Sequence, residues 1–234
     1  VLIIRPKNCR YCIHLFNAFR HVIEQIQENN PEINIIDLSA EQAEQQPVFE
    51  AIQQYNPYIV IGGGHGNVDV FTGDNETPIF TTENCEILAG RITFLHSCLT
   101  AVQLGKEIIN KGGVAYAGYY QEWVWAFEGS CQNSSCHFEH EDPVEDKYAR
   151  SFYLPAIKFS VILATTKDIN LAYEESLKEY DAWIDYWYMN PANDQYASEV
   201  MKWLIWDKEI FVLYCLEEKM EKTEERKINP FAIF

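Results

Sequence analysis

Short apolar runs alternate along the chain with stretches in which apolar residues recur at helical spacing. The runs predict six strands, at about residues 2–5, 33–38, 58–61, 91–96, 114–118 and 210–214. The helical spacing predicts helices at about residues 10–28, 47–55, 101–109, 147–165, 168–189 and 196–206. We expect Pro155 to interrupt the fourth of these helices and Asp168 to cap the fifth. Because strands and helices alternate, an α/β domain with a mostly parallel six-stranded sheet is expected.

Three segments depart from this alternation. After the third strand, extended residues flank the turn "TGDNE", which predicts a β-hairpin. Residues 119–146 show little periodicity and are expected to form a long loop, and loops of that length are more often functional than idle. Residues 217–234 form a charged tail with an apolar end, so the folded domain is expected to span residues 1–216.

Charge narrows the possible partners. The 234 residues include 35 acidic and 18 basic side chains, for a formal net charge of −17. Such a surface repels phosphate backbones and anionic lipids, so neither nucleic acid nor a membrane is an expected partner. The apolar runs are shorter than a membrane-spanning helix, and no signal-peptide pattern is present. We therefore expect a soluble chain, without assigning its location or its oligomeric state.

Seven cysteines leave at least one thiol unpaired within the chain. The sequence leaves open whether the Cys9/Cys12 and Cys131/Cys136 pairs are disulfides, metal ligands or free thiols. Zinc bound with the help of His137 and His140 would match no common finger spacing, and the acidic residues of 139–146 lack a calcium-loop pattern. No cofactor is therefore expected, with zinc and calcium as weaker alternatives.

The glycine-rich stretch "YIVIGGGHGN" places His65 at the end of the third strand. A dinucleotide fingerprint would need a third glycine where Asn67 stands, and a helix where a hairpin is expected. Phosphate binding would therefore lack the helix N-terminus that supplies its affinity. A nucleotide- or flavin-binding domain is accordingly disfavoured.

Cys98 ends the fourth strand, in "ITFLHSCLTA". We expect a helix to begin near Leu99 or Thr100, where its N-terminus would stabilise a thiolate. Functional groups gather at the carboxyl ends of parallel strands, so His65 and Cys98 would meet if their strands are neighbours. That pair is the minimum for nucleophilic catalysis by cysteine. A small buried cysteine and an unrelated turn histidine remain the alternative.

The order of these elements resembles the caspase-like cysteine peptidases, the clan of caspases, gingipains, clostripain and legumain. The likeness rests on "IVIGGGHGN", on "FLHSCLTA" and on the hairpin "VDVFTGDNETPIF" between them. The stretches "GKEIINKGGVAYAGYYQEW" and "YLPAIKFSVILATTKDINLAYEESLKEY" are similar to later parts of gingipain-like bacterial or archaeal members. The resemblance covers about residues 1–215 and implies a three-layer α-β-α sandwich.

The resemblance also implies roles for single residues. Cys98 would be the nucleophile, His65 would support the thiolate and protonate the leaving amine, and the N–H groups of Gly66 and Cys98 would form an oxyanion hole. The implied activity is a cysteine endopeptidase acting on a peptide or protein substrate. The alternative is a catalytically silent caspase-like module that binds partners.

Substrate-binding residues are harder to assign. In several members of the clan the residue two before the cysteine lines the P1 pocket, and here it is His96, where relatives that prefer Arg or Lys often carry Asp. His96 would accept a hydrogen bond or attract an acidic group, unless it is a structural histidine. Arg5 lies in a pocket-facing position by topology, and Trp123 and Trp125 would form a substrate-binding wall unless they are core aromatics.

Overall fold

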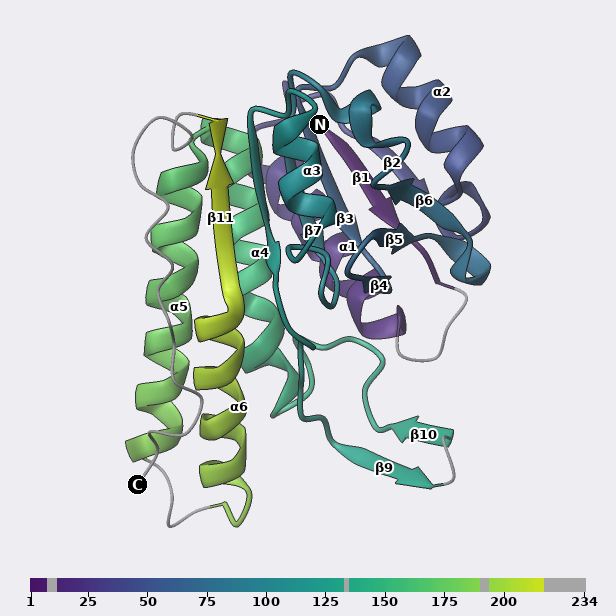
Figure 1. The fold of residues 1–234 in the computed structure, drawn as a ribbon. Coiled ribbons are helices and arrows are strands. Elements are labelled where there is room, and N and C mark those ends of the chain that lie inside the picture. The colour runs from purple at the N-terminus through teal and green to yellow at the C-terminus, as the bar shows by residue number, and fades with distance from the viewer. Residues whose placement is uncertain (8–11, 133–134, 190–193, 217–234) are drawn as a thin grey trace.

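The computed structural model describes residues 1–7, 12–132, 135–189 and 194–216. Its central six-stranded sheet has the order β11-β8-β7-β3-β1-β2 (Figure 1). Five strands are parallel, and β11 runs antiparallel to β8 at one edge. The strands are β1 (Leu2–Arg5), β2 (Ile36–Ser39), β3 (Ile59–Gly63), β7 (Ile92–His96), β8 (Ala115–Tyr119) and β11 (Phe211–Cys215). This confirms the expected α/β class and the mostly parallel sheet.

Helices cover both faces of the sheet. They are α1 (Cys12–Asn29), α2 (Gln45–Tyr55), α3 (Leu104–Asn110), α4 (Ala149–Thr166), α5 (Ile169–Met189) and α6 (Ala197–Ile210). Short 3-10 turns lie at η1 (Ala40–Gln42), η2 (Asp74–Glu76) and η3 (Cys85–Leu88). In Figure 1, α4, α5 and α6 stand together beside the sheet, and α2 lies at its opposite end. The arrangement is that of a three-layer sandwich.

Side chains of each central strand alternate between two separate cores, as the two-residue period of a strand requires. Ile3, Ile61 and Phe94 face a core built with α1, α4, α5 and α6. Their chain neighbours Leu2 and Leu95 face a second core built with α2, α3 and the hairpin after β3. Strands covered on both faces read as continuous apolar runs, which is why the sequence revealed them.

The hairpin expected after β3 is present and gains a third strand. It comprises β4 (Gly66–Asn67), β5 (Val70–Thr72) and β6 (Pro78–Thr81). The expected long loop also contains a hairpin, formed by β9 (Gly129–Gln132) and β10 (Ser135–Phe138). The charged tail, residues 217–234, lies outside the described residues.

Two predictions concern the helices α4 and α5: the one for Pro155 is wrong, and the one for Asp168 is confirmed. Pro155 does not interrupt α4, which runs through it; the missing proline N–H removes a helical hydrogen bond without ending the helix. The Pro155 carbonyl instead accepts a hydrogen bond from Ser176 Oγ of α5, at 2.9 Å. The Asp168 cap is confirmed, because its Oδ1 accepts a hydrogen bond from the Leu171 N–H at 3.0 Å.

Candidate active site

The carboxyl ends of the central strands β3 and β7 bring the two predicted catalytic residues to the same end of the sheet. The strands are adjacent and parallel, with Gly63 opposite His96. The Gly64 N–H donates to the His96 carbonyl at 3.2 Å, which continues the pairing past the last paired residues. His65 and Cys98 each lie two positions beyond the Gly63–His96 pair, so neighbouring strand ends carry both side chains.

Gly66 is the point at which the two strand ends touch. A Cβ placed on it would collide with the Ser97 hydroxyl, lie 2.6 Å from the Thr100 methyl and lie 3.0 Å from the Cys98 carbonyl oxygen. The chain after His65 therefore packs directly on the turn that carries Cys98. Only glycine fits there, for a steric reason that sequence alone could not give.

The glycines before His65 act by packing and not by turning the chain. Gly62 and Gly63 lie within β3, and neither they nor Gly64 has a positive φ. A Cβ on Gly63 would collide with the Phe19 ring, and one on Gly62 would lie 2.9 Å from Phe71. The glycine run therefore forms no tight turn beneath the site. A strand and not a helix follows it, which leaves it without the dipole of a phosphate loop.

His65 is fixed through its backbone to the hairpin. Its carbonyl accepts hydrogen bonds from the Thr72 N–H at 3.0 Å and from Thr72 Oγ1 at 3.2 Å. This makes Gly66 and Phe71 a non-hydrogen-bonded pair of the antiparallel ladder, so the Gly66 N–H is not used in pairing with β5. The half-buried His65 ring is thus carried on a braced backbone beside an N–H that does not serve the ladder.

The expected helix N-terminus behind Cys98 is absent, since α3 begins only at Leu104. Residues 97–103 form turns instead, and Leu99 has a left-handed backbone with φ of 63°. Such a conformation is strained for a residue with a side chain. Tertiary contacts hold it, because the Leu99 N–H donates to the Gln121 carbonyl at 3.2 Å and the Ala101 N–H to the Tyr119 carbonyl at 3.1 Å.

The Cys98 thiol is half-buried, and its sulfur lies 4.0 Å from the Trp123 carbonyl oxygen. Burial is the largest effect and raises the pKa of the Cys98 thiol. The contact with the Trp123 carbonyl opposes this in part, and the nearby carboxyl groups of Glu122 and Asp207 raise the pKa further. The resting site therefore holds a thiol and not a preformed thiolate. This corrects the expectation that a helix dipole would favour the thiolate.

His96 is buried among aromatic rings and is 1% exposed. Its ring meets Trp123 edge-on at 4.4 Å and lies 5.2 Å from Tyr119. Burial lowers the pKa of His96 to about 3, so the ring is neutral and offers no charge to attract an acidic group. Among the described residues neither ring nitrogen has a hydrogen-bond partner.

The two tryptophans lie where they were expected, but in different environments. Trp123 is 6% exposed and belongs to the core, whereas Trp125 is half-buried and stacks on it at 5.3 Å with an interplanar angle of 20°. The core interpretation therefore holds for Trp123, and Trp125 remains the candidate for a substrate-facing wall.

Arg5, the other predicted substrate-binding residue, is already engaged. Its guanidinium bonds the Asp37 carboxylate through Nε at 2.7 Å and Nη2 at 2.5 Å, and it lies 4.4 Å over the Phe16 ring. Binding a substrate group would require Arg5 to give up this bidentate pair. The geometry favours a role in joining β1 and β2.

Sequence reasoning missed Asp207, which approaches the site from the last turn of α6. The side chain is 0% exposed, and its Oδ1 accepts a hydrogen bond from the Val124 N–H at 3.1 Å. Burial raises the pKa of Asp207 well above its usual range, and the bond from Val124 only partly opposes this. A charged residue near a helix end reads as surface in a sequence, so no local pattern could have revealed it.

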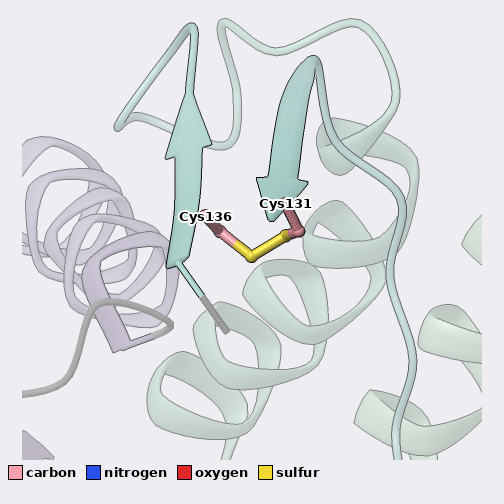
Figure 2. The surroundings of a disulfide bond; sticks show 2 residues. All are labelled: Cys131 and Cys136. Carbon is pink, nitrogen blue, oxygen red and sulfur yellow. A yellow bond between two sulfur atoms is a disulfide. The ribbon is translucent and has the colours of Figure 1, made fainter. Parts of the chain in front are cut away.

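The β9–β10 hairpin answers the question of Cys131 and Cys136, which form a disulfide between the two strands (Figure 2). Oxidised sulfurs cannot serve as thiolate ligands, so the zinc alternative for this pair is wrong. Cys12 is also disulfide-bonded, whereas Cys9 lies outside the described residues. Cys85, Cys98 and Cys215 keep their thiols.

Two residues of the acidic run serve as structural anchors. Asp142 pairs with Arg20 at 2.6 Å and with His21 at 2.8 Å, both on α1. Asp146 accepts hydrogen bonds from the N–H groups of Tyr148, just before α4, and of Ala149, its first residue. Within the part of the chain that the structure describes, no three His, Cys, Asp or Glu side chains form a group that could hold a metal ion.

Searches against models of known protein families and against curated protein sequences find no match to this chain. Across the described helices, none has the length and apolar character needed to cross a membrane.

Proposed function

We propose that the protein is a cysteine endopeptidase with a caspase-like fold, in which Cys98 and His65 form the catalytic dyad. The observation that carries the proposal is the contact of Gly66 with the Ser97–Thr100 turn, because it joins the His65 strand end to the Cys98 strand end. The mostly parallel six-stranded sheet and the hairpin after β3 support the proposal, because the resemblance rests in part on them.

In this mechanism His65 takes the proton of the Cys98 thiol when a peptide binds, because the resting thiol is protonated. The sulfur attacks the scissile carbonyl, and the oxyanion is held by the N–H groups of Gly66 and Cys98. His65 then gives its proton to the leaving amine, which departs as the carbon–nitrogen bond breaks. Water hydrolyses the thioester, which releases the acid product and restores the thiol.

The experiment is cleavage of a fluorogenic peptide library by the wild type and by Cys98→Ala and His65→Ala. Each substitution should abolish turnover and leave the circular dichroism spectrum unchanged. Cys215→Ala is the matched control, since Cys215 is also a half-buried thiol but pairs with Ala115 at the start of β8, at the other end of the sheet from Cys98. Full turnover in Cys98→Ala would exclude the proposed dyad.

Three observations favour the second candidate, a catalytically silent module that binds partners. The raised pKa of Cys98 and the absence of a helix start behind it are unusual for an activated nucleophile. Large side chains near the end of α5 and the start of α6 are exposed, as a docking surface would require: Tyr188, Met189 and Tyr196. A Cys98 that reacts with iodoacetamide no faster than Cys215, in a protein that cleaves no peptide, would favour this candidate.

A further inference from the structure

The end of β8 and the segment that follows it run along the turn that carries Cys98 and contact it three times. The Tyr119 carbonyl accepts from the Ala101 N–H, the Gln121 carbonyl accepts from the Leu99 N–H, and the Trp123 carbonyl lies 4.0 Å from the Cys98 sulfur. The strained backbone of Leu99 sits within these contacts. The position of the thiol therefore depends on where residues 119–124 lie.

The last turn of α6, which Figure 1 shows leading directly into β11, also bonds to this segment. Trp206 donates its indole N–H to the Glu122 carbonyl at 2.9 Å, and Asp207 accepts from the Val124 N–H at 3.1 Å. These two bonds flank Trp123, whose carbonyl meets the thiol. The helix thus reaches the candidate nucleophile through a single peptide segment, although more than a hundred residues separate them along the chain.

The Asp207 side chain is not at this position for its effect on stability. It is fully buried, and its Oδ2 has no hydrogen-bond partner among the described residues. A buried carboxyl group with one oxygen unpartnered destabilises a fold unless something compensates for it. A role other than stability accounts for a polar side chain at this position.

We propose that Trp206 and Asp207 are positioning residues, which hold the Glu122–Val124 segment so that the Trp123 carbonyl fixes the Cys98 thiol in the geometry for attack. Neither residue touches the reacting atoms. The catalytic consequence rests on the proposed peptidase function, whereas the effect on the thiol itself does not.

The test compares Asp207→Ala with Asp207→Asn and measures two quantities, the rate at which iodoacetamide alkylates Cys98 and the kcat and KM for a cleaved peptide. Asparagine keeps an acceptor for the Val124 N–H, and alanine removes it. In Asp207→Ala the freed thiol should be alkylated several times faster, and kcat should fall on the order of 10²-fold with KM nearly unchanged. Asp207→Asn should restore both values towards wild type.

A second pair of variants covers the case in which Asp207→Ala does not fold. Trp206→Phe removes the bond to the Glu122 carbonyl at a partly exposed site. Trp183→Phe, the control, removes an indole bond to the Glu179 carboxylate that lies within α5. Alkylation of Cys98 should be faster in Trp206→Phe than in Trp183→Phe. Equal rates in that pair, or wild-type alkylation in a folded Asp207→Ala, would overturn the proposal. The expected alkylation differences in a protein that cleaves no peptide would support the positioning role and reject the peptidase function.

Discussion

Two buried aspartates, Asp146 and Asp207, anchor opposite ends of the long segment between β8 and α4. They differ in how many hydrogen bonds their carboxyl groups accept. Both are 0% exposed. Asp146 accepts three backbone hydrogen bonds, from Tyr148 at 2.9 Å, Ala149 at 2.8 Å and Glu128 at 2.7 Å. Asp207 accepts one from Val124, and burial raises its pKa well above the usual range.

This difference in hydrogen bonding suggests that Asp146 serves stability, whereas Asp207 serves the candidate site. Asp146 starts α4 and ties it to the base of the β9–β10 hairpin, with both of its oxygens used. Asp207 keeps one oxygen unused beside the candidate nucleophile. Because satisfied polar groups stabilise a fold and unsatisfied ones weaken it, the two ends of the segment should respond oppositely to the same substitution.

The largest loss is expected for Asp146→Ala, which leaves three buried or part-buried N–H groups without their acceptor. We expect the free energy of unfolding to fall by about 3 kcal/mol. Urea unfolding followed by circular dichroism measures it. Asp146→Asn should lose less, since its Oδ1 still accepts at α4 while its amide cannot accept from Glu128. A loss well under 1 kcal/mol in Asp146→Ala would contradict the anchoring role.

His96 should make the protein sensitive to acid. Its folded pKa of about 3 lies below the ordinary value of 6.5, so the unfolded chain binds a proton that the folded ring refuses. The part of the free energy of unfolding that depends on a neutral His96 is fully present above pH 6.5 and is lost as the pH falls towards 3. Between pH 7 and pH 5 the loss is about 2 kcal/mol. His96→Leu should flatten this part of the stability curve in urea titrations at several pH values. An unchanged slope would mean that the folded ring titrates normally.

The Cys131–Cys136 disulfide is a covalent tie within the same segment. Because the ring it closes is small, with a sequence separation of 5, we expect the double variant Cys131→Ala/Cys136→Ala to lose about 2 kcal/mol at most. Thermal unfolding of the oxidised protein and of the variant gives the comparison. A loss equal to that of Asp146→Ala would place the disulfide among the main anchors and weaken the contrast.

Asp207→Asn is expected to gain stability instead of losing it. The folded pKa of Asp207 is raised, so wild-type Asp207 must take up a proton on folding, at a cost that grows as the pH rises above the unfolded value of 3.8. Asparagine carries no such cost. The variant should match the wild type near pH 4 and exceed it increasingly towards neutral pH, in the urea titrations used for His96. A variant less stable than wild type at neutral pH would show that the ionised carboxylate is favoured.

The sequence predicted those parts of the molecule that local patterns control. Strands buried on both faces appear as apolar runs, and Asp168 caps its helix as its residue type suggests. The start of α3 was wrong because contacts from distant segments decide it. The N–H groups of Gln103 and Leu104 both donate to the Val68 carbonyl, which draws the chain away from a helix between Cys98 and Leu104.

The candidate site divides in the same way. The strand ends that carry His65 and Cys98 followed from the order of strands, and the neighbouring positions of β3 and β7 confirm the condition on which their meeting depended. Asp207 could not be predicted, because a carboxyl group on a helix faces solvent in most proteins and only the packing of α6 buries this one. The state of the Cys98 thiol likewise depends on burial that no motif records.

The most direct test of the central claim is to map where a peptidyl acyloxymethyl ketone attaches covalently. Cys85, Cys98 and Cys215 are the candidate thiols of the described chain, and Cys215 matches Cys98 in being half-buried. Intact-mass and peptide-mapping measurements should find a single adduct, on Cys98, that disappears in His65→Ala and on prior unfolding. Labelling of Cys215 at the same rate as Cys98, or labelling of Cys98 that His65→Ala leaves unchanged, would contradict the account.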